Sequence, residues 1–289
     1  MQSCNWLVFP VAVGWAAALA CFAPAVHADE GVFAQENLVA WCIVPFDAKK
    51  RGPEERAEML ARLGIRKLAY DWRDEHVASF DAECEAMKRH GIAIEAWWFP
   101  AGLNPTARKI LEVLKRHKLQ AQLWVSMGDP APKGSQEEKV AAAAAVIRPI
   151  AEEAAKIGSK VALYNHGGWF GEPENQLAIL QRLGLANVGI VYNFHHGHAH
   201  IDRFPELFKR MQPHLLAVNL NGMVRHGDAS GKKILTIGKG DQELGMMKVI
   251  AESGWRGPVG ILDHRPETDS ETTLRENLEG LMRLRKQLQ

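Results

Sequence analysis

Short apolar runs alternate with longer amphipathic stretches along most of this chain. Runs rich in Val, Ile, Leu and aromatic residues indicate buried strands, whereas apolar positions that recur every three or four residues indicate helices. The predicted strands cover residues 38–44, 66–72, 92–99, 121–126, 160–165, 188–193, 215–220 and 258–263. The predicted helices cover residues 53–63, 77–89, 105–117, 136–157, 173–183, 203–211, 242–253 and 268–289.

Glycine follows most of the predicted helices, as expected where a helix ends in a left-handed residue. These glycines are Gly64, Gly91, Gly158, Gly184 and Gly254. Eight strand–helix units in a chain of 289 residues predict a single (β/α)8 barrel. The alternative is a doubly wound open sheet, which usually has fewer strands. No glycine-rich fingerprint follows the first strand, so we expect no nucleotide cofactor.

The N-terminal segment has a different composition. Residues 1–28 contain no Lys, Arg, Asp or Glu, and the small residues of 25–28 precede Asp29 and Glu30. This pattern predicts a signal peptide at 1–28, with cleavage after Ala28 and a barrel domain at 29–289. We therefore expect a periplasmic or secreted protein with no membrane attachment after cleavage. A membrane anchor, or lipoprotein anchoring at Cys21, is the alternative.

The net charge bears on the expected binding partners, and the cysteine content bears on whether a disulfide forms. The formal net charge is +1, which gives no electrostatic reason to expect nucleic acid as a partner. Cleavage would leave Cys42 and Cys84. Two cysteines so far apart in sequence are compatible with one disulfide in an oxidising compartment or with buried free thiols.

Polar and aromatic residues collect where the predicted strands end, which is where (β/α)8 barrels place their chemistry. Four histidines lie within residues 195–200, directly after the sixth strand. Glu95 lies inside an apolar strand and needs a partner, which makes it a candidate acid/base. Tryptophans near the strand ends suit the apolar face of a sugar ring or a protein interface. They are Trp72, Trp97, Trp98, Trp124 and Trp169.

Two segments carry a family resemblance. Residues 161–168, Val-Ala-Leu-Tyr-Asn-His-Gly-Gly, and residues 191–199, Val-Tyr-Asn-Phe-His-His-Gly-His-Ala, resemble the xylose isomerase-like barrels, also called the sugar phosphate isomerase/epimerase family. The resemblance implies isomerase, epimerase, dehydratase or lyase chemistry beside a sugar carbonyl. It also implies a divalent metal such as Mn, Mg or Zn, held by side chains at the ends of strands five to eight.

The sequence departs from the family pattern at the ligand positions. Tyr164 replaces the usual Glu, Asn193 the usual Asp and Asn219 the usual His, while Asp263 matches the final Glu position. Neutral side chains bind Mg²⁺ or Mn²⁺ poorly compared with carboxylates. A metal, if bound, is therefore expected among His166, His196 and Asp263.

These observations favour an exported enzyme acting on a sugar or oxidised sugar by acid/base chemistry. The expected catalytic residues are Glu95, His166, His196 and Lys239. The expected substrate-binding residues are Asp71, Arg73, Trp97, Tyr164, Asn165, Asn193, His198, Asn219 and Asn221. The alternative is a non-catalytic barrel that binds a glycan or a partner. A metal-dependent endonuclease is disfavoured by the near-neutral charge, and the oligomeric state is left open.

Overall fold

The computed structural model describes residues 1–2 and 31–288. In this part of the chain, eight parallel strands close into a barrel in which each strand pairs with its sequence neighbours and the last pairs with the first. The strands are β1 Leu38–Trp41, β2 Lys67–Tyr70, β3 Ala93–Phe99, β4 Gln122–Val125, β5 Val161–Tyr164, β6 Val188–Asn193, β7 Leu215–Leu220 and β8 Val259–Leu262. The predicted (β/α)8 barrel is confirmed.

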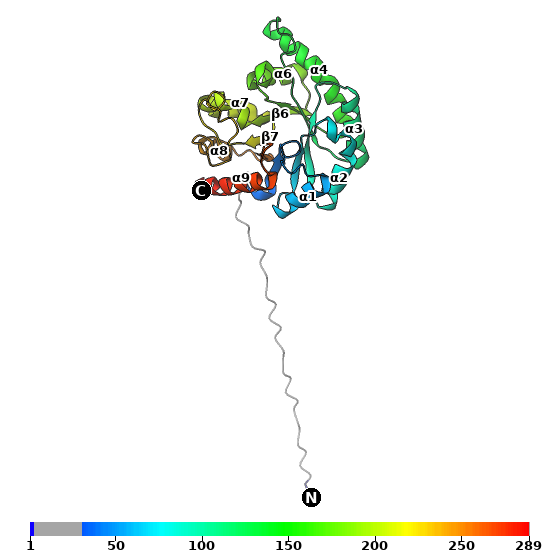
Figure 1. Cartoon of the computed structure of the whole chain (residues 1–289), viewed down its shortest axis with the longest axis vertical. Helices are drawn as coiled ribbons and strands as arrows, with labels where there is room; N and C mark the ends of the chain where they lie inside the picture. The colour runs from blue at the N-terminus through cyan, green and yellow to red at the C-terminus, as the bar shows by residue number, and fades with distance from the viewer. Residues whose placement is uncertain (3–30, 289) are drawn as a thin grey trace. The chain divides into compact units, whose positions relative to one another are not determined.

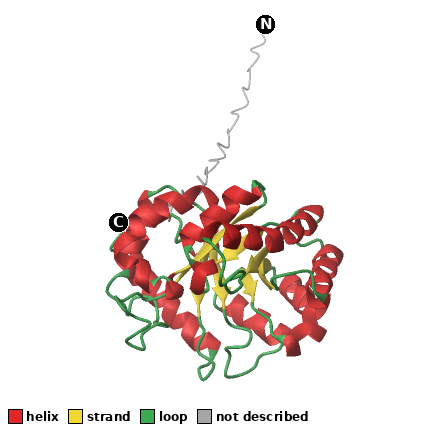
Figure 2. Cartoon of the chain, turned by 90° about the horizontal axis from the view of Figure 1, so that it is seen from above, coloured by secondary structure: helices red, strands yellow, loops and turns green. Residues whose placement is uncertain are grey.

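Helices surround the barrel strands, as Figures 1 and 2 show. They are α1 Pro53–Arg62, α2 Phe80–Arg89, α3 Pro105–His117, α4 Gln136–Lys156, α5 Gly168–Gly171, α6 Pro173–Leu183, α7 Phe204–Met211, α8 Glu243–Glu252 and α9 Ser270–Arg285. Shorter 3-10 helices are η1 Gln35–Asn37, η2 Asp74–Ser79, η3 Phe194–His196, η4 His198–Arg203 and η5 Gln212–His214. The sequence pattern did not predict α5 or the 3-10 helices, since single turns carry no hydrophobic periodicity.

Local sequence signals set the helix ends. Ser135 accepts a hydrogen bond from the Glu138 backbone, and the Glu138 side chain accepts one from the Ser135 backbone, which is a capping box. Asn104 caps α3 and Asp269 caps α9 without a reciprocal bond, because each side-chain oxygen accepts one backbone N–H of the first turn. The glycine predicted to end the fifth long helix, Gly184, has φ +61° and caps α6.

Apolar side chains form two layers. Most pack between the strands and the helices, in a continuous core. A smaller layer fills the barrel interior, where large rings on some strands face alanines on others. Trp41 and Trp124 meet edge to face at 4.8 Å inside the barrel, and the Trp41 Nε1–H donates to the Tyr164 hydroxyl at 3.2 Å. The interior is therefore a packed core, and chemistry is confined to the barrel mouth.

The structure leaves the targeting predictions untested. Most of the predicted signal peptide, residues 3–28, lies outside the described residues. Within the described part, no helix has the length and apolar character needed to cross a bilayer. Cys42 and Cys84 are both buried and free, so the disulfide alternative does not occur.

Candidate functional site

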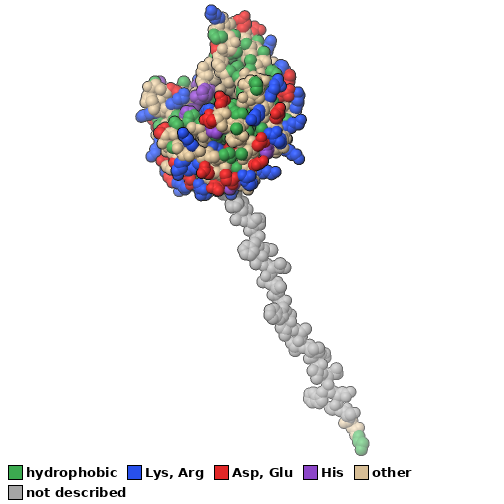
Figure 3. Space-filling view, turned by 45° about the vertical axis from the view of Figure 1, so that its right-hand side comes forward, with side chains coloured by type: hydrophobic (Ala, Val, Ile, Leu, Met, Phe, Trp, Pro, Cys, Tyr) green, Lys and Arg blue, Asp and Glu red, His purple; other side chains and the backbone are tan. Residues whose placement is uncertain are grey.

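A cavity of about 50 Å³ opens at the C-terminal ends of the strands. Its polar lining consists of Cys42, Asp71, Arg73, His166, His195 and His264. Its aromatic lining consists of Trp41, Phe46, Trp98 and Tyr164. These residues follow or end strands β1, β2, β3, β5, β6 and β8, so the closure of the barrel brings them together. Figure 3 shows histidine side chains gathered in a hollow of the surface.

Asp71, the first residue after β2, is the carboxylate of this cavity. It is 1% exposed, and its Oδ1 accepts a hydrogen bond from the Val44 backbone at 3.2 Å. Its Oδ2 has no hydrogen-bond partner among the described residues. Burial raises the pKa of Asp71 to about 7, against the opposing charge of Arg73. A carboxyl group that titrates near neutral pH is well suited to take up and return a proton.

Two cations act on the cavity, Arg73 as part of its lining and Lys233 through its charge. The Arg73 guanidinium donates to the backbone oxygens of Asp71 and Trp72 and lies 5.5 Å from the Phe46 ring centroid. Lys233, in the loop between β7 and α8, pairs with Asp228 at 3.2 Å and keeps 43% of its side chain exposed. Both charges act on the cavity histidines, so the site favours negative charge that develops on a bound molecule.

Histidine rings line one wall of the cavity. His166 and His196 lie with ring centroids 4.5 Å apart, and His195 and His196 with centroids 3.9 Å apart. Burial, together with the neighbouring His166 and Lys233, lowers the pKa of His196 to about 2. Burial also lowers the pKa of His166, His195 and His264, with Lys233 contributing in each case. The wall is thus neutral imidazole at neutral pH.

The backbone is strained beside this wall. Cys42 and His264 have φ of +59° and +60°, in the left-handed region that non-glycine residues rarely adopt. The His264 backbone N–H donates to the Cys42 carbonyl oxygen at 3.3 Å. Strained residues of this kind cluster at functional sites, which supports the assignment of the cavity as the site. The Cys42 thiol is not activated, because burial and the Asp71 carboxylate raise its pKa well above the usual range.

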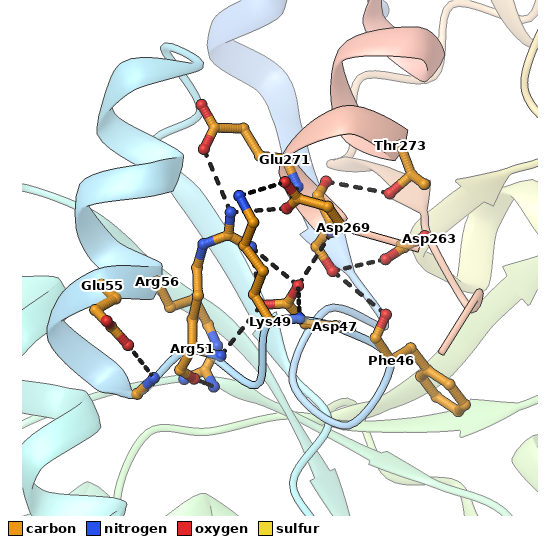
Figure 4. A network of polar contacts seen from close by, with 12 residues as sticks. Phe46, Asp47, Lys49, Arg51, Glu55, Arg56, Asp263, Asp269, Glu271 and Thr273 are labelled. Atoms are coloured by element: carbon orange, nitrogen blue, oxygen red, sulfur yellow. Dashed lines mark hydrogen bonds and ion pairs between the residues drawn. The ribbon is translucent and has the colours of Figure 1, made fainter. Parts of the chain in front are cut away.

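A polar network holds the loop that carries Phe46 (Figure 4). Arg51 bonds both carboxylate oxygens of Asp47 at 2.9 Å and reaches Asp269 at 2.7 Å. Lys49 also binds Asp269, at 2.7 Å. The loop after β1 is thereby tied to the start of α9. The Phe46 ring consequently packs on His264, with centroids 4.0 Å apart.

Asp263 belongs to this network and not to the cavity. Its Oδ2 accepts a hydrogen bond from Ser270 Oγ at 2.7 Å, and the next residue, His264, faces the cavity instead. The predicted metal set of His166, His196 and Asp263 therefore does not converge. In the described part of the chain no group of three or more His, Cys, Asp or Glu is arranged to hold a metal ion. Together with Tyr164, Asn193 and Asn219, this donor set does not fit the metal that the family resemblance implied.

The predicted substrate-binding asparagines bind one another. Asn165 Oδ1 accepts from the Asn193 backbone at 2.7 Å, and Asn219 Nδ2 donates to Asn193 Oδ1 at 2.6 Å. A Cβ on Gly260 would lie 1.7 Å from Asn219 Oδ1, so only glycine leaves room for this chain. Asn221 is held by the Lys233 carbonyl and the Leu235 backbone. These amides, each at most 2% exposed, position strands β5 to β7, and among their side-chain atoms Asn219 Oδ1 alone has no hydrogen-bond partner within the described residues.

Glu95 lies far down the barrel from the cavity residues of its strand. It is the extra residue of a bulge in the β2–β3 pairing, near the N-terminal end of β3. Its Oε1 accepts from Gln122 Nε2 at 3.3 Å, and the same amide contacts the Leu216 carbonyl at 3.2 Å. Glu95 is thus only partly buried, and its partner is a glutamine. The structure does not bring Glu95 to the mouth.

Three further expected residues lie outside the cavity. Trp97 is fully buried and packs edge-on against Tyr70 and Phe80, in the layer between strands and helices. Lys239 is exposed in the loop before α8. His198 is buried, and its two ring nitrogens lie 2.9 Å and 3.0 Å from backbone carbonyl oxygens, so it joins two loops. Trp97 and His198 thus have structural reasons for their places that are unrelated to a substrate.

Six residues that line the cavity were not among the expected site residues, and neither was Lys233, which acts on the cavity electrostatically; the six are Trp41, Cys42, Phe46, Trp98, His195 and His264. Trp98 and His264 each lie one residue away from an expected site residue, Trp97 and Asp263, and a correct strand register would have identified them. Phe46 and Lys233 lie in loops without a motif, so only the fold identifies them. Among the expected residues, the cavity unites Asp71, Arg73, Tyr164 and His166, with His196 stacked on His166.

Comparison with known proteins identifies the family. Residues 66–285 match the model of the xylose isomerase-like TIM barrel family, and this match covers most of the chain. The chain belongs to that family. The sequence matches none of the curated proteins with which it was compared.

Solved structures share the fold at low sequence identity. The IolI protein with a bound zinc atom is 16% identical, with a TM-score of 0.67 over 87% of this chain and 99% of that one. The 3-keto-D-glucoside 4-epimerase YcjR from E. coli is 15% identical, with a TM-score of 0.65 over 86% and 99%. A D-tagatose 3-epimerase-like protein is 16% identical, with a TM-score of 0.65 over 86% and 98%.

Proposed function

Starting from membership of the xylose isomerase-like family, we propose that this protein is a sugar-modifying enzyme that moves a proton on the carbon beside a carbonyl of a sugar or oxidised sugar. The observation that carries the proposal is Asp71, a buried carboxyl with a free Oδ2 and a pKa raised to about 7. Similarly folded proteins that bear epimerase names, one of them for a 3-keto sugar, support the substrate class. We also propose export through the signal peptide at 1–28.

In the proposed reaction, Asp71 Oδ2 takes the proton and the C–H electron pair forms an enolate. Arg73 and Lys233 stabilise the negative charge on the enolate oxygen, because Arg73 lines the cavity and the charge of Lys233 acts on the histidine beside it. Return of the proton to the opposite face gives an epimer, and return to the neighbouring carbon gives an isomer. For an epimer, we assign the second face to His166, which faces the cavity: it takes up a proton from solvent and donates it to the opposite face of the carbon, while Asp71 releases its proton to solvent.

Proton exchange with solvent tests the proposal directly. The protein is incubated with 2-keto and 3-keto sugars in D₂O, and loss of the C–H signal beside the carbonyl is followed by NMR. We expect exchange in the wild type and at least a hundred-fold slower exchange in Asp71→Asn.

Asp263→Asn is the matched control, because Asp263 is also a buried carboxyl at a strand end but bonds Ser270. Its exchange rate should stay within about three-fold of the wild type. The proposed role of Asp71 would be refuted by no exchange with any of these sugars. It would also be refuted if Asp71→Asn and Asp263→Asn slowed the exchange equally. Binding of the sugars without exchange would favour the non-catalytic alternative.

A further inference from the structure

A shallow groove adjoins the cavity and is much larger than it. The groove has a volume of about 540 Å³ and is lined by Trp72, Arg73, Asp74, Glu75, Trp98 and Pro100. It shares Arg73 and Trp98 with the cavity, so the two spaces lie side by side. The cavity of about 50 Å³ accommodates a reacting carbonyl group and its neighbouring carbon but not a whole sugar ring. Sites that enclose whole ligands measure roughly 300–1,000 Å³.

The chemistry of the groove differs from that of the cavity. The cavity has neutral imidazoles and two cations that act on it, whereas the groove presents the exposed carboxylates of Asp74 and Glu75. Exposed carboxylates accept hydrogen bonds from hydroxyl groups and repel anions. Trp98 is partly exposed and supplies an aromatic surface for the C–H face of a sugar ring.

The groove is also rigid. The Trp72 Nε1–H donates to the Trp98 carbonyl oxygen at 2.6 Å, and the Arg73 guanidinium is held by the backbone oxygens of Asp71 and Trp72. Preorganised walls lower the entropic cost of ordering a bound ligand. The groove therefore has the size, the chemistry and the rigidity of a binding subsite.

We propose that this groove is a second sugar subsite, and that the substrate is a disaccharide or a glycoside whose neutral sugar unit occupies it. The reacting unit then lies over the cavity, with its carbonyl group toward Asp71 and the two cations. This inference rests on the proposed function for the nature of the reacting unit. The proposal that the second sugar is neutral rests instead on the exposed carboxylates and the aromatic ring that line the groove.

Isothermal titration of the full-length protein tests the subsite. The probes are D-glucose against cellobiose and maltose, and D-galactose against lactose. We expect at least one disaccharide to bind ten-fold or more tightly than its monosaccharide. Asp74→Ala combined with Glu75→Ala should reduce this preference to less than three-fold. Both side chains are exposed, so folding is retained.

Glu252→Ala is the matched control, because Glu252 is an exposed carboxylate at the end of α8. It should keep the full disaccharide preference. Equal affinity for monosaccharides and disaccharides, no binding of any probe, or a preference that survives the double substitution would overturn the subsite. A disaccharide preference without proton exchange would instead overturn the proposed function and leave the subsite standing.

Discussion

His166 and His196 lie with their ring centroids 4.5 Å apart, one just beyond β5 and the other just beyond β6. Neither ring is paired with a carboxylate in the described part of the chain, and His196 Nε2 is buried without a partner. Protonation of either ring would place a charge beside the other ring and near Lys233. The contact therefore favours neutral imidazoles.

This contact predicts loss of stability in acid. The folded pKa of His196 is about 2, below the value of about 6.5 in an unfolded chain, so the unfolded state binds more protons at pH below 6.5. Stability is thus fully present above pH 6.5 and falls as the pH drops below it. Between pH 6 and 4, the free energy of unfolding of His196→Asn should fall by about 1 kcal/mol less per pH unit than that of the wild type. Urea unfolding at each pH measures this slope.

The exposed His226 provides the control. It also has a positive φ, which asparagine tolerates, so His226→Asn should keep the wild-type slope. Asp71 acts in the opposite direction. Its pKa is raised in the folded state, so its contribution to the free energy of unfolding falls as the pH rises toward 7. That contribution is common to all three proteins and cancels in the comparison. Identical slopes in the wild type and His196→Asn would contradict the neutral pair.

Asp71 predicts the pH profile of proton exchange. A base with a pKa of about 7 is mostly protonated at pH 5.5 and mostly ionised at pH 8.5. At limiting sugar concentration, the exchange rate should rise with pH, reach half its maximum near pH 7 and then level off. NMR exchange rates from pH 5.5 to 9 give the profile. A rate independent of pH in this range would remove Asp71 from the role of base.

Two lysines of one loop allow a test of whether a positive charge near the cavity stabilises the enolate. Lys233 acts electrostatically on the cavity histidines, whereas Lys239 is exposed and has no such effect. We expect Lys233→Met to slow exchange at least ten-fold, because the enolate loses a stabilising charge. Lys239→Met should change the rate less than two-fold. The reverse result would restore the assignment of Lys239 as the catalytic lysine.

Two adjacent tryptophans should separate binding from stability. Trp97→Ala removes a fully buried ring and should lower the free energy of unfolding by about 3–5 kcal/mol. Trp98→Ala should weaken sugar binding at least ten-fold at a smaller cost in stability, since Trp98 is partly exposed at the cavity. Urea unfolding and titration calorimetry on both variants measure the two effects. Weakened binding in folded Trp97→Ala alone would contradict the arrangement.

The donor set predicts that exchange does not depend on a bound metal. Tyr164 accepts from Trp41, Asn193 and Asn219 bond each other, and Asp263 bonds Ser270. Elemental analysis of the purified protein should find less than stoichiometric Mn, Mg or Zn. Dialysis against a chelator should leave the exchange rate within about two-fold. Stoichiometric metal, together with activity that is lost on chelation and restored by metal, would show that the side chains rearrange around an ion.

The sequence by itself determined the barrel. Periodicity separates strands from helices, and capping residues such as Ser135 and Gly184 act through local hydrogen bonds and backbone angles. The resemblance at residues 161–168 and 191–199 placed the site at the barrel mouth, and the match over residues 66–285 shows the family. Asp71, Arg73 and His166 were identified because they directly follow strands.

Only the tertiary structure decided which neighbouring side chain faces the cavity. Successive residues of a strand point to opposite faces, and the bulge at Glu95 shifts that alternation along β3. Trp98 therefore enters the mouth while Trp97 enters the core, and His264 faces the cavity while Asp263 faces α9. Lys233 lies in a long loop whose path is held by His198 and Asn221, and its charge acts on the cavity histidines.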